Sequence, residues 1–161
     1  MLRTINLHQA PKHHIAVYTD ASIRKQKLGL GIYSKYQQTS AFFLERRRHY
    51  DIHFGEMAAI LYSIKTTPCF APLVIYTDSD AAIHHVASHC SKYSMLRNEI
   101  RNTISHQHND VWLTKIKGHS NIYGNDAAHK LAFTGADLHD GMLFELMHNV
   151  LIKTHHKKQH T

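Results

Sequence analysis

The hydrophobic positions in the first part of the chain follow the two-residue period of β-strands. Residues 14–19 form a short, partly β-branched apolar run, which predicts a buried strand that ends at Asp20. In residues 28–32, leucine and isoleucine alternate with glycine, and residues 41–44 form a third apolar run about one hairpin loop later. The pattern therefore predicts three consecutive strands in an antiparallel meander.

The period then changes to that of a helix. Apolar residues from Met57 to Ile64 recur at positions i, i+3, i+4 and i+7, which predicts a helix that starts beside Glu56 and stops before Pro68. Residues 73–77 predict another buried strand, which ends on Asp78 in the same way that the first ended on Asp20. The remaining pattern predicts helices around residues 82–87 and 96–104, a strand over 111–116 and a final helix around 128–132.

These elements follow the order β-β-β-α-β-α-α-β-α, which is typical of an α/β fold. We expect a five-stranded mixed sheet in which strands 1–3 are antiparallel, while strands 4 and 5, which follow helices, are parallel. With 161 residues, 43% of them hydrophobic, the chain is long enough for one core, and we expect a single domain over residues 1–152. Residues 142–152 are expected to form a C-terminal helix packed on the domain, or alternatively a partner contact, and residues 153–161 a flexible, basic, histidine-rich tail.

The charge balance favours a nucleic-acid partner. The chain has 19 lysines and arginines against 12 acidic residues, a formal net charge of +7, which suits a phosphate backbone. No run approaches the roughly 18 apolar residues of a membrane span, and no signal-peptide pattern is present, so we expect a soluble, cytoplasmic protein. Cys69 and Cys90 lack a metal-ligand spacing, which fits reduced thiols in the cytoplasm. We assign the 17 scattered histidines no role as a group.

Three carboxylates are expected to meet at one edge of this sheet. Asp20 and Asp78 end central strands, where an open α/β sheet places its functional residues, and Glu56 opens the first helix. Carboxylates held so close repel one another unless a cation neutralises them. Oxygen ligands suit Mg²⁺ or Mn²⁺, and two such ions roughly 3.5–4 Å apart can activate water at a phosphodiester and stabilise its leaving oxygen.

Four sequence blocks resemble, in order, those of type 1 ribonuclease H. The resemblance covers about residues 14 to 135, and it implies a ribonuclease H-like fold. Each block is weak alone, but four in sequence with matching predicted elements are specific. The blocks are residues 19–22 (Thr-Asp-Ala-Ser), 55–60 (Gly-Glu-Met-Ala-Ala-Ile), 76–80 (Tyr-Thr-Asp-Ser-Asp) and 117–120 (Lys-Gly-His-Ser).

The resemblance implies an endonuclease that hydrolyses the RNA strand of an RNA–DNA hybrid and leaves 5′-phosphate ends. It implies two Mg²⁺ or Mn²⁺ ions with substrate bound, with Asp20 bridging both and Glu56 and Asp78 completing the metal site. It also implies that His119, on a loop, assists water activation or product release. Such hybrids are recognised by minor-groove shape and 2′-hydroxyls, so we expect little sequence specificity.

The fourth metal ligand departs from the family pattern. The family has Gly-Asn-Glu-x-Ala-Asp-x-Leu-Ala, whereas residues 124–132 read Gly-Asn-Asp-Ala-Ala-His-Lys-Leu-Ala. In register, His129 takes the place of the ligand aspartate and Asp126 that of the glutamate. We therefore predict His129 as a catalytic residue and metal ligand, with a shift of preference toward Mn²⁺. The alternative is that His129 is only a surface histidine and that Asp126, or no residue, compensates.

Other departures from the family pattern concern residues that would bind the hybrid. Residues 51–53 read Asp-Ile-His where the family often has a Thr-Asn-Asn-like segment, and the extra basic helix of some members is absent. We predict substrate contacts from Ala21, Ser22, Arg46 and Arg47, with Ala21 replacing a common glycine but retaining its N–H. Residues 24–27 and 153–158 are further basic candidates. Tyr50 or Trp112 offers a stacking surface, although an aromatic residue beside a strand is more often part of the core.

Two other functions remain open from the sequence. Integrases and exonucleases use the same fold and metal chemistry, although the block around Glu56 and the Lys-Gly-His loop favour ribonuclease H. The second alternative is a catalytically weak or inactive nucleic-acid-binding module, for which His129 is the best evidence. In each case we expect a monomer without a membrane partner.

Overall fold

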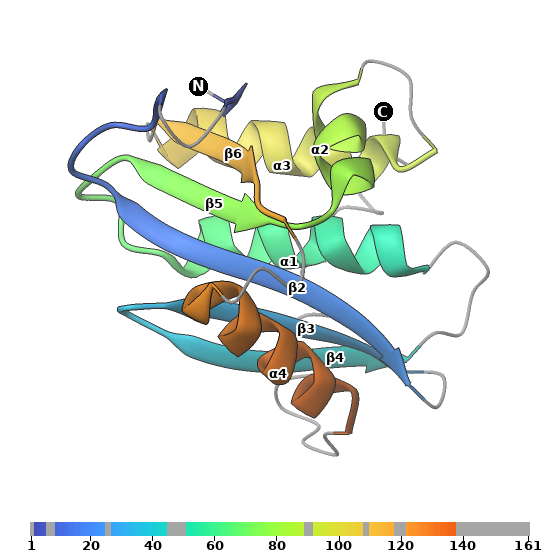
Figure 1. The fold of residues 1–161 in the computed structure, drawn as a ribbon. Helices are drawn as coiled ribbons and strands as arrows, with labels where there is room; N and C mark the ends of the chain where they lie inside the picture. Colours follow the sequence, from blue (N-terminus) through green and yellow to red (C-terminus); the bar gives the residue numbers. More distant parts are fainter. Residues whose placement is uncertain are drawn as a thin grey trace.

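A six-stranded mixed sheet forms the centre of the fold (Figure 1). The computed structural model describes residues 2–5, 9–24, 27–44, 51–88, 92–107, 110–117 and 122–137. The strand order across the sheet is β1-β6-β5-β2-β3-β4. The strands are β1 (Leu2–Thr4), β2 (Ile15–Arg24), β3 (Lys27–Ser34), β4 (Gln38–Leu44), β5 (Leu73–Thr77) and β6 (Val111–Lys115).

The sheet has an antiparallel part and a parallel part, which confirms the predicted fold class. Strands β2, β3 and β4 form the predicted antiparallel meander, and β5 pairs in parallel with both β2 and β6. The expected number of five strands is wrong by one, because β1 pairs in parallel with β6, with Leu2 opposite Val111. A strand of three residues is too short to show a hydrophobic period, so the sequence pattern did not indicate it.

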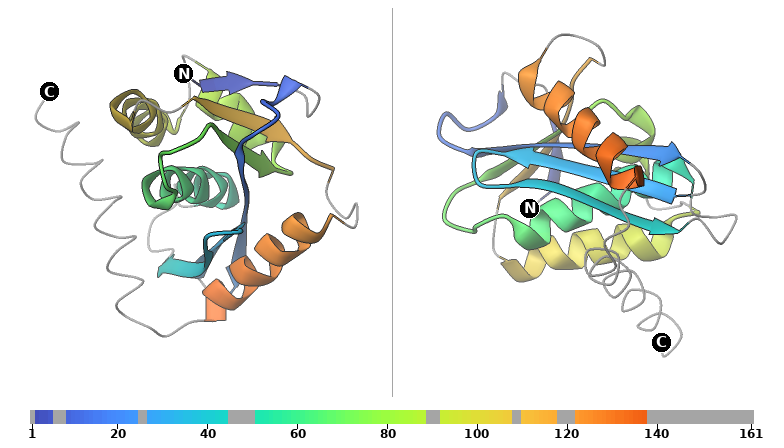
Figure 2. Two further views of the ribbon diagram at one scale, coloured as in Figure 1. Left: turned by 90° about the vertical axis from the view of Figure 1, so that its left-hand side faces the viewer. Right: turned by 90° about the horizontal axis from the view of Figure 1, so that it is seen from below.

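Helices cover both faces of the sheet (Figure 2). Helix α1 (Ile52–Thr66) and helix α3 (Ser94–Gln107) lie on one face, with the short α2 (Asp80–Ala87) packed beside them. Helix α4 (Tyr123–Asp137) lies on the other face, across β2, β3 and β4. Among the described residues, no helix has the length and apolar character that crossing a membrane requires.

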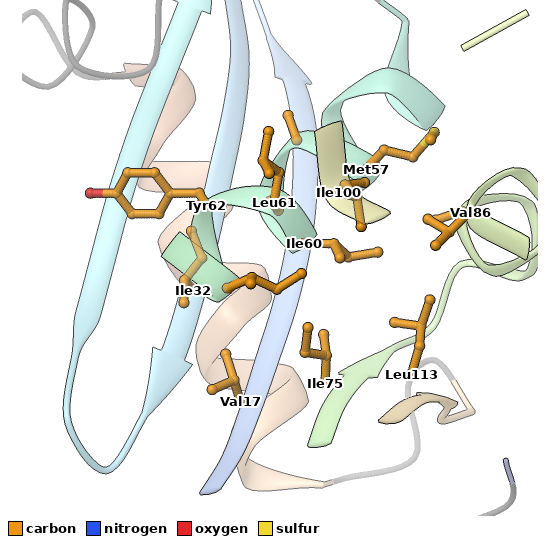
Figure 3. Packing of buried hydrophobic residues seen from close by; sticks show 14 of the residues in the cluster. Val17, Ile32, Met57, Ile60, Leu61, Tyr62, Ile75, Val86, Ile100 and Leu113 are labelled. Atoms are coloured by element: carbon orange, nitrogen blue, oxygen red, sulfur yellow. The ribbon is translucent and has the colours of Figure 1, made fainter. Parts of the chain in front are cut away.

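The main hydrophobic core lies between the sheet and α1 (Figure 3). Every residue of α1 from Gly55 to Ile64 is buried, because the sheet covers one side of the helix and α3 the other. Val17 and Ile75 of the sheet and Ile100 of α3 belong to this core. Such close packing fixes the position of α1 and of any functional residue on it.

Two of the element boundaries that differ from the predictions involve a carboxylate of interest. Strand β2 continues past Asp20 to Arg24, because residues 19–24 pair with β3. Helix α1 begins at Ile52 and not beside Glu56, because the side chain of Asp51 caps its N-terminus. Asp20 therefore lies within a strand, and Glu56 lies inside a helix. The predicted helix over residues 142–152 and the tail over 153–161 lie outside the described residues.

Helix α4 approaches β3 very closely. A Cβ atom on Gly31 would lie 2.0 Å from the Ala128 carbonyl oxygen, and one on Gly29 would meet the helix backbone at 2.1 Å. Glycine in a strand often marks such a close approach of another backbone. Gly31 is the strand partner of Asp20, so the same contact brings α4, with His129, toward Asp20.

Candidate active site

Asp20 and Asp78 occupy matching positions on adjacent strands. The parallel pairing of β2 and β5 ends with Tyr18 opposite Tyr76, and each aspartate follows two residues later. Asp78 comes directly after the end of β5, as predicted, whereas Asp20 belongs to the part of β2 that pairs with β3. The shared register of the two strands therefore brings these carboxylates to the same edge of the sheet.

Glu56 completes a cluster of three carboxylates. One carboxylate oxygen from each of Asp20, Glu56 and Asp78 lies within 4.8 Å of the other two. Asp20 and Glu56 are buried, and Asp78 is half-buried. The structure thus brings together the three acidic residues that the sequence singled out.

The cluster is electrostatically unfavourable without a cation. Burial raises the pKa of Glu56 well above its ordinary value, and the neighbouring Asp20 and Asp78 raise it further. Burial and Asp78 also raise the pKa of Asp20, although hydrogen bonds from His129 and from the Ala21 backbone partly oppose this change. Either protons or a bound cation must offset the repulsion among these carboxylates.

One oxygen of the cluster has no hydrogen-bond partner. Oε2 of Glu56 is buried without a donor, and within the described ranges only Thr19 Oγ1 shares that condition. A buried carboxylate oxygen without a partner is costly unless a ligand satisfies it. Three carboxylates are also the hard oxygen donors that Mg²⁺ and Mn²⁺ prefer. The residues present therefore fit a divalent metal ion.

His129 reaches this cluster from α4 through Asp20. Its Nδ1 lies 2.8 Å from Oδ2 of Asp20 and donates a hydrogen bond to that carboxylate. The His129 side chain is 58% exposed, whereas that of Asp20 is 7% exposed. The candidate metal-binding group among the described residues consists of the three carboxylates and does not include His129. The ligand role of His129 stays a prediction.

The structure describes some of the other predicted site residues and not the rest. The buried Ala21 donates its backbone N–H to Oδ1 of Asp20 at 2.9 Å, and Ser22 follows as a half-buried residue of β2. Asp126 is exposed in the first turn of α4 and does not belong to the carboxylate group. Three predicted residues lie outside the described residues: His119, Arg46 and Arg47.

Two residues proposed as nucleic-acid contacts have partners within the domain. Nη1 of Arg24 lies 2.7 Å from Oδ2 of Asp137, and its guanidinium lies 3.8 Å from the centre of the Phe133 ring. These contacts tie β2 to the last turn of α4, and a hybrid contact by Arg24 stays a prediction. Trp112 is only 8% exposed and packs in a small second core, which agrees with the core alternative for this residue.

Sequence reasoning missed the structural role of Asp51. In the sequence this carboxylate only marks a departure from a family segment, but in the structure its Oδ1 accepts a hydrogen bond from the Phe54 N–H at 2.9 Å and caps α1. Its Oδ2 accepts from the Tyr93 hydroxyl at 2.5 Å and from Lys92 at 3.4 Å. An aspartate just before a helical pattern is a known start signal, and it was available in the sequence.

Asp51→Ala is expected to lower the free energy of unfolding by about 1 kcal/mol at neutral pH. Burial alone would raise the pKa of Asp51, but hydrogen bonds from Tyr93, Phe54 and Lys92 outweigh it and lower that pKa. A lowered pKa stabilises the fold above the unfolded value, about 3.9, and this contribution disappears as the pH falls through the folded value. The difference between wild type and variant, measured by urea unfolding, should therefore shrink on acidification. A difference that does not change with pH would contradict the ionised cap.

Comparison with known proteins assigns the family. The model of the RNase H family matches residues 12–137, which is most of the chain and includes the whole described carboxylate cluster and His129. A search of curated proteins finds no match. The fold, the register of Asp20 with Asp78 and the carboxylate group agree with the family match. The chain therefore belongs to the RNase H family.

Proposed function

We propose that this protein hydrolyses the RNA strand of RNA–DNA hybrids endonucleolytically and leaves 5′-phosphate ends. The observation that carries the proposal is the cluster of Asp20, Glu56 and Asp78, whose ligand oxygens lie within 4.8 Å of one another beside an unpartnered buried Glu56 oxygen. Membership of the RNase H family and the net charge of +7 support a nucleic-acid hybrid as the substrate. The reaction is expected to have little sequence specificity.

The three carboxylates would hold the divalent ions, Mg²⁺ or Mn²⁺. Two bound ions of this kind supply an activated water nucleophile and neutralise charge on the leaving oxygen. Asp20 is prepared for this role because the Ala21 N–H and the His129 ring each hold one of its oxygens. Glu56 is held by the tightly packed α1, which keeps its carboxylate aimed at the other two.

The remaining roles are part of the same proposal. Ala21 and Ser22, which follow Asp20 on β2, would contact the substrate backbone next to the scissile phosphate. Arg46 and Arg47 would neutralise neighbouring phosphates, and His119 would assist water activation or product release. We also propose that the protein acts as a cytoplasmic monomer, where the exposed thiol of Cys69 stays reduced.

A cleavage assay with an end-labelled hybrid tests the proposal. Incubation with Mg²⁺ or Mn²⁺ should cut only the RNA strand at many positions, and a chelator should stop the reaction. Duplex DNA and duplex RNA of the same sequence should remain intact, which separates this activity from that of other nucleases on the same fold. The matched inactive control is Asp78→Asn, which removes one half-buried carboxylate with little change in size.

A non-catalytic nucleic-acid-binding module is the second candidate. The observation in its favour is that the α4 residue bonded to Asp20 is an imidazole, and not a fourth carboxylate. The same labelled hybrid separates the two functions. Binding that weakens with salt, without cleavage in either metal, would support the module and contradict the hydrolase.

A further inference from the structure

The hydrogen bond between His129 and Asp20 constrains what else Asp20 can bind. An ionised carboxylate only accepts hydrogen bonds, so the Nδ1–H of His129 donates to Oδ2 of Asp20. The other oxygen of Asp20, Oδ1, already accepts from the Ala21 N–H. Both carboxylate oxygens of Asp20 therefore accept a hydrogen bond, whereas one oxygen of Glu56 has no hydrogen-bond partner.

The position of His129 differs from that of a shared ligand. The three carboxylates each place an oxygen within 4.8 Å of the other two, and His129 does not belong to this group; its Nδ1 bonds to Oδ2 of Asp20. The backbone of α4 that carries His129 is held in place, because the glycines of β3 let the helix pack directly on the strand. The imidazole therefore occupies the side of Asp20 that faces α4.

The charge of the site also indicates that His129 changes how many ions can bind. Three carboxylates more than balance one divalent ion, but a second ion would leave the site positive unless another negative group joins it. A carboxylate at position 129 would supply that group, and an imidazole cannot, because it carries no negative charge. The histidine therefore removes both a ligand atom and a negative charge from the side of the site that faces α4.

We propose that His129 is a positioning residue that holds Asp20 and limits the substrate-free protein to one tightly bound divalent ion. That ion is held by Asp20, Glu56 and Asp78. This inference rests on the proposed metal site, and it gives His129 a role through Asp20 instead of direct coordination. Asparagine at position 129 would keep an N–H donor close to the place of Nδ1, whereas aspartate would replace the donor with a new ligand.

Titration with Mn²⁺, followed by electron paramagnetic resonance of the free ion, tests this role without any cleavage. Wild type and His129→Asn should each bind one ion, and His129→Asp should bind a second. His129→Ala should still bind one ion, about tenfold more weakly, because Asp20 loses an orienting bond. The matched control is Thr134→Asp, which adds a carboxylate at an exposed position of α4 and should behave as wild type. Circular dichroism establishes that each variant is folded.

Three outcomes would overturn the role of His129. They are a second tightly bound ion in wild type, no second ion in a folded His129→Asp variant, or complete loss of the ion in His129→Ala, which would make His129 a ligand. Absence of Mn²⁺ binding by wild type would overturn this role together with the metal site. If the variants bind the expected numbers of ions but wild type does not cleave the hybrid, only the proposed hydrolysis is contradicted. The two failures are therefore distinguishable.

Discussion

Glu56→Gln is expected to lower the rate of hybrid cleavage about 10³-fold or more, because metal-ion stabilisation of a transition state is worth several kcal/mol. The side chain belongs to the carboxylate cluster, is buried and has an oxygen without a hydrogen-bond partner, which a bound cation would satisfy. Glutamine keeps the size of the side chain but removes its charge and one ligand oxygen. The rate is measured with the labelled hybrid in Mg²⁺ and Mn²⁺.

The same variant is expected to be more resistant to heat than wild type in the presence of a chelator. Burial, with Asp20 and Asp78, raises the pKa of Glu56, so the folded protein binds this proton more tightly than the unfolded chain. The stability of the metal-free protein therefore falls as the pH rises from the unfolded value, about 4.3, through the raised folded value. Glutamine removes this pH-dependent loss, and the gain should be visible as a higher Tm at pH 7.

Asp137→Asn is the matched control for Glu56→Gln. Its carboxylate is half-exposed and pairs with Arg24 at the end of α4, away from the carboxylate cluster. The control should cleave the hybrid at the wild-type rate and show no gain of Tm in chelator. Full cleavage by Glu56→Gln would contradict the proposed metal site, and an unchanged Tm of the metal-free variant would contradict the repulsion within the cluster.

Gly31→Ala is expected to lower the free energy of unfolding by about 3 kcal/mol or more, because added volume in a packed contact forces the backbone to move. The new Cβ would lie 2.0 Å from the Ala128 carbonyl oxygen and 2.5 Å from the Ala132 nitrogen. Both atoms belong to the backbone of α4 and cannot turn away. The helix would have to shift, which would also disturb the bond between His129 and Asp20. Thermal unfolding should show a decrease in Tm of roughly 10 °C.

Gly55→Ala is the comparison for Gly31→Ala. A Cβ on Gly55 would lie 2.6 Å from Cδ1 and 2.9 Å from Cγ of Leu28, and 3.1 Å from Cβ of Ala21, which are side-chain atoms and not backbone atoms. Alanine also favours the helix in which Gly55 lies. The loss of stability should therefore be clearly smaller at Gly55 than at Gly31. Equal losses, or a larger loss at Gly55, would contradict a rigid contact between β3 and α4.

The sequence alone was sufficient for the order of the elements after β1 and for the three carboxylates of the cluster. Alternation in residues 28–32 and the helical period from Met57 to Ile64 are local signals, and both correspond to the elements that form. Asp78 after a buried strand, together with Asp20 and Glu56 in recognisable blocks, was sufficient to predict a carboxylate cluster. These features follow from the chain itself because each depends on the spacing of neighbouring residues.

The tertiary structure decided the features that depend on contacts between distant residues. It added β1, which forms only by pairing with β6, and it extended β2 beyond Asp20 through pairing with β3. It also turned Asp51 into a helix cap bonded to Tyr93, and it placed His129 against Asp20. No spacing along the chain encodes these distances, because they result from strand register and from how closely α4 can pack on the glycines of β3.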